Sequence, residues 1–217
     1  MKKKVVIIAL IICLIGLVAV GGTLAYFSAS DKATNKFMIT SYDPDDPNPS
    51  PDSLFSIKVY EHDKSGKEVE ELNFTDIAPG TVVSKDPTVE NTGQYSAWVR
   101  VNVEFSNANT WIRLMKKHNI DDLVQLFGGY SDTDWYRTSN KYTLNEEEDT
   151  LAYSFYCQKS LAKGDKTTLF TSFKIPSEFD ADDMSKLNYF ELKVTADAIQ
   201  KANTGDSAYF AFSNYWK

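Results

Sequence analysis

The sequence has few of the residues that build reactive or cross-linked sites. Its 217 residues include two cysteines and two histidines. Cys13 lies inside an apolar run near the amino terminus, so Cys157 alone remains if that run is removed, and no disulfide can then form within the chain. We therefore expect packing to supply the stability and Cys157 to be a small buried side chain. The alternative for Cys157 is a link between two chains.

Patterns typical of catalytic and metal sites are missing as well. His62 and His118 do not have the HExxH spacing that places two zinc ligands on one helical face, and we expect both to be exposed to solvent. The acidic runs at 146–149 and 180–183 are expected in solvated loops, because they do not have the alternate spacing of a helix–loop–helix calcium site. The sequence predicts no catalytic residue, no metal and no cofactor.

Positive charge is also scarce. Lysine and arginine number 23 against 30 aspartates and glutamates, and the formal net charge is −7. This balance argues against nucleic acid as a partner, because binding to nucleic acid depends on neutralising its phosphates. The balance fits a soluble secreted protein.

What the chain does have is an export signal. Lysines at 2–4 precede an apolar run over residues 5–20, and the small residues of GGTLA follow. The run is short for a membrane span, which needs ~20 residues. This arrangement is typical of a secretory signal peptide over residues 1–25, cleaved between Ala25 and Tyr26. We expect the mature protein outside the cell, in the extracellular matrix or at the cell surface.

A short strand-prone segment, residues 26–40, follows the signal and is separated from the rest by SYDPDDPNPSPDS at 41–53. Proline fixes φ and removes hydrogen-bond donors, so this proline- and aspartate-rich stretch is expected to be an extended linker. When extended it spans about 40 Å.

Residues 54–203 predict a β domain. Apolar and polar residues alternate over 55–60, 97–105, 169–175 and 190–198, which indicates half-buried antiparallel strands. Turn signals separate them, at Pro79-Gly80, Asn91-Thr92-Gly93 and Lys163-Gly164-Asp165. The fold expected is mainly β, a jelly-roll-like antiparallel β-sandwich with short helical insertions.

Two stretches have helical character. Residues 110–127 have helical spacing, with a helix start favoured at Asp121-Asp122 and an end at Gly128-Gly129. Residues 177–187 predict one or two further turns, and we expect both stretches to pack on or cap the sandwich. The aromatic tail 204–217 is expected either to pack against the sandwich or to expose an aromatic patch.

Several segments resemble one known family. The signal region GGTLAYFSASDKATNKF is similar to those processed by the SipW-type signal peptidase of Gram-positive bacteria. The segments IAPGTVVSKDPTVENTGQYSAWVRV (77–101), LAKGDKTTLFTSFKIP (161–176) and VTADAIQKAN (194–203) resemble the core of the TasA/camelysin family of biofilm-matrix fibre proteins. The resemblance covers the signal and most of the β core.

The resemblance implies a jelly-roll subunit that polymerises head to tail into extracellular, pilus-like fibres. The implied mechanism is donor-strand complementation, in which the amino-terminal segment of one subunit completes a sheet of the next. Such a contact joins two different surfaces and therefore propagates into a filament. The implied partners are further copies of this chain, the dedicated signal peptidase and an anchor or minor fibre protein.

The donor segment would run from Tyr26 to about Thr40, and its candidate residues are Tyr26, Phe27, Ala29, Lys32, Lys36, Phe37 and Ile39. Two alternatives stay open: the segment forms the first strand of its own domain, or it is a disordered tail. Lys32 and Lys36 are also candidates for isopeptide bonds between subunits, because some secreted sandwich domains join lysine to asparagine or aspartate.

Two other functions compete with the fibre subunit. A secreted adhesive or carbohydrate-binding sandwich would use the aromatic residues at 209–217. A camelysin-type metallopeptidase is suggested by the family name alone, because a zinc hydrolase needs about three protein ligands and a water, which the two histidines do not supply.

Overall fold

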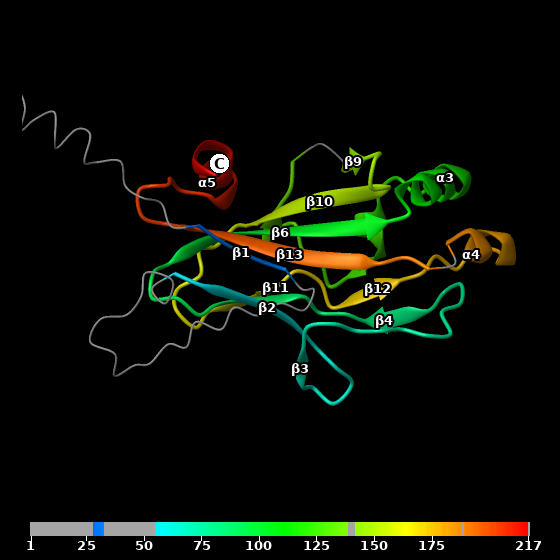
Figure 1. The fold of residues 1–217 in the computed structure, drawn as a ribbon, viewed down its shortest axis with the longest axis horizontal. Helices are drawn as coiled ribbons and strands as arrows, with labels where there is room; N and C mark the ends of the chain where they lie inside the picture. Colours follow the sequence, from blue (N-terminus) through cyan, green and yellow to red (C-terminus); the bar gives the residue numbers. More distant parts are fainter. Residues whose placement is uncertain (1–27, 33–54, 139–141, 188, 217) are drawn as a thin grey trace, which may run out of the picture.

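The structure is a computed structural model that describes residues 28–32, 55–138, 142–187 and 189–216, and for 28–32 the course of the backbone alone. Its described strands form three antiparallel sheets. Figure 1 shows them in two layers, with the largest sheet above and the two smaller sheets side by side below it. The mainly β, antiparallel sandwich expected from the alternating segments is confirmed.

The largest sheet forms the upper layer of the sandwich. Its order is β1 (Ser28–Lys32), β13 (Leu192–Gln200), β6 (Ala97–Ser106), β10 (Thr150–Cys157) and β8 (Trp135–Tyr136), with β9 (Thr143–Asn145) also on β10. The long central strands lie where the sequence alternates most regularly, and β6 buries Val99, Val101, Val103 and Phe105 on one face. Period-two alternation of this length therefore predicted the centre of the sheet correctly.

The lower layer contains two smaller sheets. The four-stranded sheet has the order β11 (Lys166–Thr168), β5 (Thr88–Asn91), β2 (Ile57–His62) and β3 (Glu68–Val69). The three-stranded sheet has the order β4 (Val82–Ser84), β12 (Ser172–Lys174) and β7 (Phe127–Gly128). One hydrophobic core fills the space between the layers, with side chains from both, including Val59, Val89, Phe127, Phe155, Phe173 and Ala196.

The strand expected over 169–175 is wrong as a single element. The chain leaves one lower sheet after β11 and joins the other at β12. Leu169 and Phe170 between them are both buried, at 1% and 0% exposure. Both side chains enter the core at the point where the chain passes from one lower sheet to the other, so the strand alternation does not continue through them.

The helical stretch expected over 110–127 is two elements. Helix α3 (Ala108–His118) ends at Asn119, which has a left-handed backbone (φ 54°) and donates its N–H to the Met115 carbonyl. Asparagine tolerates that conformation and stops the helix. Asp122 then caps the 3₁₀ helix η1 (Leu123–Leu126) by accepting from the Val124 N–H at 3.1 Å, so the helix start favoured at Asp121-Asp122 does occur.

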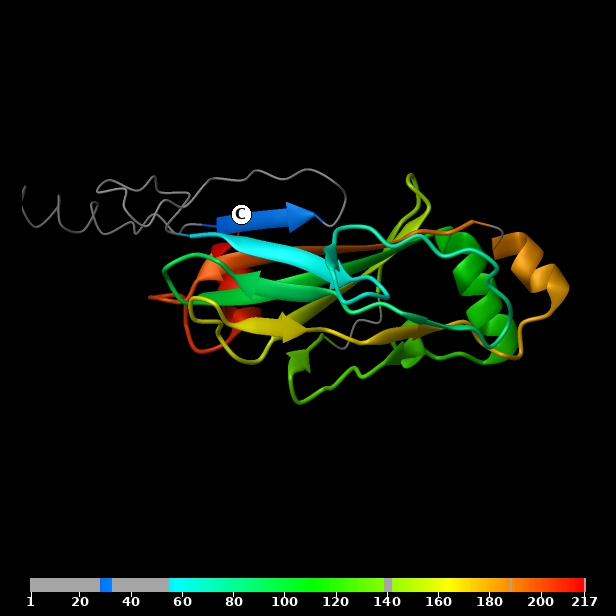
Figure 2. The ribbon, with the colours of Figure 1, turned by 90° about the horizontal axis from the view of Figure 1, so that it is seen from below.

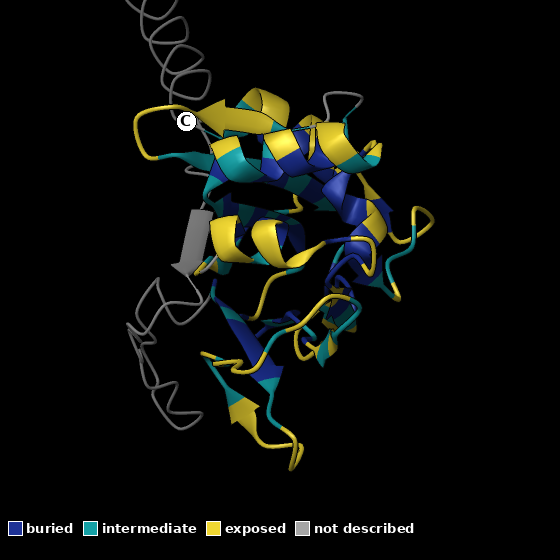
Figure 3. Ribbon diagram, turned by 90° about the vertical axis from the view of Figure 1, so that its right-hand side faces the viewer, coloured by how far each residue is buried: buried dark blue, intermediate teal, exposed yellow. Residues whose placement is uncertain are grey.

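Helix α4 (Ala181–Leu187) provides the turns expected within 177–187 and contacts α3. Both helices cap the same end of the sandwich (Figure 1). Figure 3 looks onto this end, where much of the outer surface of the helices is exposed.

The carboxyl-terminal tail forms helix α5 (Ala208–Tyr215), which packs on the outer face of the large sheet (Figure 1). Ala208, Ala211 and Phe212 bury Trp98 of β6 and Ile199 of β13. Of the two expectations for this tail, packing against the sandwich is therefore correct for most of its length.

Candidate functional site

The described part of the amino-terminal segment lies at an edge of the large sheet. Strand β1 pairs antiparallel with β13, from Ser28 opposite Ile199 to Lys32 opposite Thr195. It also lies beside β2 of the lower layer (Figures 1 and 2). This placement corresponds to the alternative in which the segment serves as the first strand of its own domain.

The candidate donor residues divide between described and undescribed parts. Ala29 and Lys32 occupy register positions opposite Ala198 and Thr195 of β13. The signal peptide 1–25 and the linker 41–53 lie outside the described residues. So do the other donor candidates and both residues of the expected cleavage site, which are Ala25, Tyr26, Phe27, Lys36, Phe37 and Ile39. The candidate isopeptide bonds of Lys32 and Lys36 are likewise untested.

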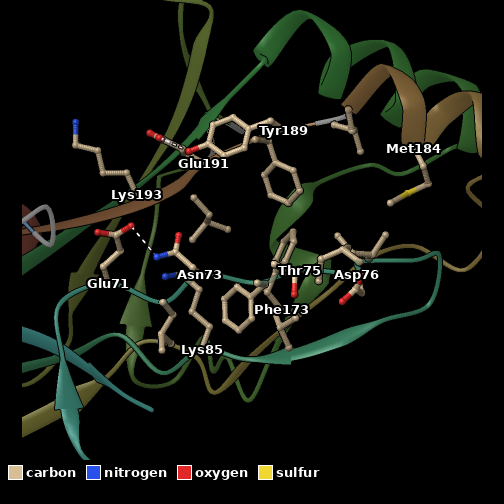
Figure 4. A pocket seen from close by; sticks show the side chains of 18 of the residues that line it. Glu71, Asn73, Thr75, Asp76, Lys85, Phe173, Met184, Tyr189, Glu191 and Lys193 are labelled. Carbon is tan, nitrogen blue, oxygen red and sulfur yellow. Dashed lines mark hydrogen bonds between the residues drawn. The ribbon is translucent and has the colours of Figure 1, made fainter. Parts of the chain in front are cut away.

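A groove of about 900 Å³ begins where β1 ends. One wall is the first half of β13, Leu192 to Val194, and another is the segment 70–77 that follows β3. Apolar side chains of the core line it as well, among them Phe173 and Ile175. Helix α4 borders it, and Figure 4 shows Phe173 and Met184 of this lining. The groove is thus an open part of the sandwich beside a strand edge.

Glu61 and Lys85 form a buried ion pair that lines this groove. Lys85 Nζ donates to Glu61 Oε1, and the side chains are 2% and 10% exposed for Glu61 and Lys85 respectively. Burial raises the pKa of Glu61 because it disfavours the charged carboxylate, whereas Lys85 acts in the opposite direction. The second oxygen, Glu61 Oε2, is buried and has no hydrogen-bond partner among the described residues.

Sequence analysis did not identify Glu61, although its position gives a signal. Alternation in β2 puts Glu61 on the same row as Ile57 and Val59, both of which are buried. A carboxylate on a core-facing row needs a cation or a hydrogen-bond donor. Lys85 comes from the segment after β4, and nothing in the sequence places it beside Glu61.

Both histidines are paired with aspartates. The expectation that they are exposed is wrong for His118, whereas the side chain of His62 is still 36% exposed. His62 Nδ1 lies 2.6 Å from Asp86 Oδ2, and its backbone N–H donates to Asp86 Oδ1 at 2.8 Å. His118 Nε2 lies 2.8 Å from Asp183 Oδ2, and its side chain is 12% exposed. Each pair joins residues distant in sequence.

Asp183 also corrects the expectation that 180–183 is a solvated loop. Its side chain is 1% exposed and accepts from Lys117 Nζ at 2.7 Å as well as pairing with His118. These contacts, with Lys117 first, hold the pKa of Asp183 well below its usual range. The acidic run at 146–149 is mostly exposed as expected, although Asp149 Oδ1 accepts from the Asn109 N–H in the first turn of α3.

One cluster of carboxylates within the described residues has oxygen atoms close enough together to hold a metal ion. Carboxylate oxygens of Asp180, Asp182 and Asp183 lie within 4.8 Å of one another. Lys117 Nζ already bridges Asp180 and Asp183, at 2.9 and 2.7 Å. The cluster therefore serves to dock α4 on α3.

Cys157 is buried at the end of β10, opposite Trp135 of β8, and burial raises the pKa of its thiol. The expectation of a small buried side chain is confirmed. A thiol in this environment is a poor nucleophile, because the reactive thiolate is disfavoured.

An exposed aromatic group lies where α5 meets the β8–β10 edge. Tyr136 and Tyr209 are 43% and 40% exposed, and their ring centroids are 5.1 Å apart. Tyr156 packs edge-on against Tyr209 at 5.2 Å. Of the aromatic residues expected in a patch at 209–217, Tyr209 belongs to this group and Phe210 is 48% exposed, whereas Tyr136 and Tyr156 come from β8 and β10.

Comparisons of this chain with protein-family models, with curated proteins and with solved structures find no match. Within the described residues, no helix has the length and apolar character needed to cross a membrane.

Proposed function

We propose that this chain is a secreted structural subunit that polymerises into extracellular, pilus-like biofilm-matrix fibres through exchange of its amino-terminal strand. The observation that carries the proposal is the position of β1 at the edge of the large sheet, paired with β13 and adjoining an open groove. A strand held by a backbone ladder can be replaced by the same strand of another copy, because the ladder is identical in both cases.

The pattern of the segment agrees with this role. In the register of β1, odd-numbered positions stand opposite even-numbered positions of β13, whose Val194, Ala196 and Ala198 belong to the core. The apolar residues of segment 26–40 singled out above, Phe27, Ala29, Phe37 and Ile39, are all odd-numbered. A donor strand in this register would therefore turn these four apolar residues to the core side, together with Asp31, which stands opposite Ala196.

The proposal includes the partners that the family resemblance implies. These are further copies of the chain, a SipW-type signal peptidase and an anchor or minor fibre protein. Exchange between open-ended copies produces a filament because the donor and acceptor surfaces differ. No observation on the described residues favours the metallopeptidase alternative.

Electron microscopy of the mature protein tests the proposal. Deleting residues 26–40 should abolish filaments, while circular dichroism still reports a folded β core. The matched control is Ser50→Pro in the linker, which is already rich in proline and should still form filaments. Filaments of normal appearance from the deletion variant would show that assembly does not use this segment.

A carbohydrate-binding or adhesive function is the second candidate, and the exposed Tyr136–Tyr209 pair favours it. Exposed aromatic groups of this kind mark interaction surfaces. Glycan retention by the monomer, lost in a variant truncated after Thr204, would support this alternative. Equal retention by both proteins would exclude the tail as the glycan site, and no retention by the monomer would reject the alternative.

A further inference from the structure

The groove beside β13 includes a strand edge that is unpaired within the described residues. Residues 192–200 of β13 pair with β6 on one side, but β1 covers 195–199 alone on the other. Along Leu192 to Val194, no strand among the described residues pairs with that second side. Such an edge offers backbone donors and acceptors to one more extended segment.

The groove also contains the ion pair of Glu61 and Lys85, whose hydrogen bonding is incomplete within the described residues. Glu61 Oε2 has no hydrogen-bond partner among the described residues, although Glu61 is 2% exposed. Lys85 carries three N–H donors and uses one on Glu61 Oε1. A buried hydrogen-bond acceptor without a donor costs free energy. The unpartnered Glu61 Oε2 therefore indicates that a segment bound in the groove supplies the hydrogen-bond donor.

The complement of this pair is a carboxamide. Its NH₂ group donates to a carboxylate oxygen, and its carbonyl accepts from an ammonium. A lysine or an aspartate in the same place would satisfy one of the two groups and repel the other. The chemistry therefore selects asparagine or glutamine on the core-facing row of an incoming strand.

The register of β1 identifies such a residue. Lys32 stands opposite Thr195, and one residue forward on the incoming strand is one residue back on β13. A donor strand that kept this register would bring Asn35 opposite Leu192, which lines the groove together with Glu61 and Lys85. Asn35 is odd-numbered, so it belongs to the row that would face the core.

We propose that the groove lined by Glu61, Lys85 and Leu192 binds the 26–40 segment of a second copy of this chain and forms hydrogen bonds with the carboxamide of its Asn35. The Asn35 NH₂ group donates to Glu61 Oε2, and the Asn35 carbonyl accepts from Lys85 Nζ. This contact fixes the register of the exchanged strand, because shifting the strand by one residue turns Asn35 away from the core. The inference rests on the proposed fibre function and names its acceptor site.

Disulfide trapping tests the position of the segment. One variant of the mature chain, residues 26–217, carries Asn35→Cys and another carries Leu192→Cys, both with Cys157→Ser so that each has a single cysteine, and the two are mixed under mild oxidation. The expected result is a disulfide-linked dimer of the two variants. The control pair replaces Asn35→Cys by Asn48→Cys in the linker and should give little of this dimer.

Introducing a charge at residue 35, and then compensating for it at residue 61, tests the proposed contact of Asn35 with Glu61 and Lys85. Asn35→Asp places a second carboxylate beside Glu61 and should raise the critical concentration for filaments about tenfold, the size of effect of one hydrogen bond to a charged group. Adding Glu61→Gln to the same chain restores the donor–acceptor match and should recover most of that loss. Asn48→Asp should leave the critical concentration unchanged.

The outcomes separate this inference from the proposed function. Filaments without the 35–192 cross-link, or without rescue by Glu61→Gln in a chain that circular dichroism shows to be folded, overturn the acceptor site while strand exchange stands. No filaments from the unaltered mature chain, together with no cross-link between chains, overturn the proposed function and this inference with it.

Discussion

At the scale of single residues, Glu61 shows how a charged side chain occupies a core-facing position. Strand β2 continues its inward row from Val59 to Glu61, and the burial of that carboxylate is balanced by Lys85. A buried ion pair contributes little net stability, but removing one partner leaves an uncompensated charge. The pair is therefore stable as a unit and vulnerable to single substitutions.

Lys85→Met should lower the free energy of unfolding by about 3 kcal/mol, because Glu61 would lose its cation in a site of low dielectric. The double variant Lys85→Met with Glu61→Leu should recover most of that loss, since no buried charge remains. Urea unfolding followed by tryptophan fluorescence measures both. A double variant that is less stable than Lys85→Met would contradict this account.

Asp183 should make the stability of the helical end depend on pH. Its pKa is lowered in the folded state, so its stabilising contribution is present above the unfolded pKa, about 3.9, and is lost as the pH falls towards the folded pKa. Asp183→Asn should lower the melting temperature at pH 7, and the difference from the unaltered protein should shrink below about pH 4.

Asp182→Asn is the matched control for Asp183→Asn. Asp182 lies in the same helix, but its side chain is 68% exposed and pairs with the exposed Lys186. Exposed pairs contribute little, so its melting temperature should be near that of the unaltered protein at every pH. Equal effects of the two substitutions in thermal melts would show that the buried contacts to Lys117 and His118 are not the cause.

At the scale of elements, helix α5 is attached by one apolar face. Phe212 is buried against Trp98 and Ile199, and the guanidinium of Arg100 lies 4.6 Å from the centre of its ring. Phe210 in the same helix is 48% exposed. The helix therefore covers the outer face of the large sheet chiefly through Phe212 and its small neighbours Ala208 and Ala211.

Phe212→Ala should destabilise the protein by about 3 kcal/mol, because it removes a buried aromatic ring and leaves a cavity over Trp98. Phe210→Ala should change stability by less than about 1 kcal/mol, since its ring is half exposed. Thermal unfolding measures the difference, and a red shift of tryptophan emission reports exposure of Trp98. Similar losses from both substitutions would contradict packing through Phe212.

The shorter elements show why periodicity predicted some boundaries and not others. The alternation in β6 and β13 extends over nine or ten residues, and both strands formed as expected. Helical spacing continues across Asn119, but that residue ends α3 through a local left-handed backbone. Leu169 and Phe170 likewise belong to a segment that alternates in sequence, but they lie where the chain passes from β11 in one sheet to β12 in the other. Local conformation and sheet assignment depend on contacts that the pattern does not contain.

At the scale of the whole molecule, the proposed function makes assembly depend on export, because the expected signal peptide adjoins the expected donor segment. On the proposed function, cleavage after Ala25 frees Tyr26 at a new amino terminus, and the following strand can then enter another copy. While the signal is attached, its apolar run over residues 5–20 would keep that strand at the membrane. Processing would thus both release the subunit and permit its assembly.

Ala25→Phe should block processing, because the residue before the cleavage site must be small. The variant should remain in the membrane fraction and fail to extend fibres, as judged by fractionation with immunoblotting and by electron microscopy. Ala19→Leu, which keeps the apolar run intact, should be processed normally. Fibres assembled from unprocessed Ala25→Phe chains would show that cleavage is not needed for assembly.

The sequence by itself determined the β class of the domain, its central strands and the burial of Cys157. The reason is that apolar residues at every second position mark the side of a strand that faces the core. It also predicted the export signal, the linker and the donor segment, which stay predictions. The tertiary structure alone decided the pairing of β1 with β13, the groove where β1 ends and the meeting of Glu61 with Lys85. It also paired each histidine with an aspartate distant in sequence. These features depend on how separate segments pack against one another, and no local pattern specifies that.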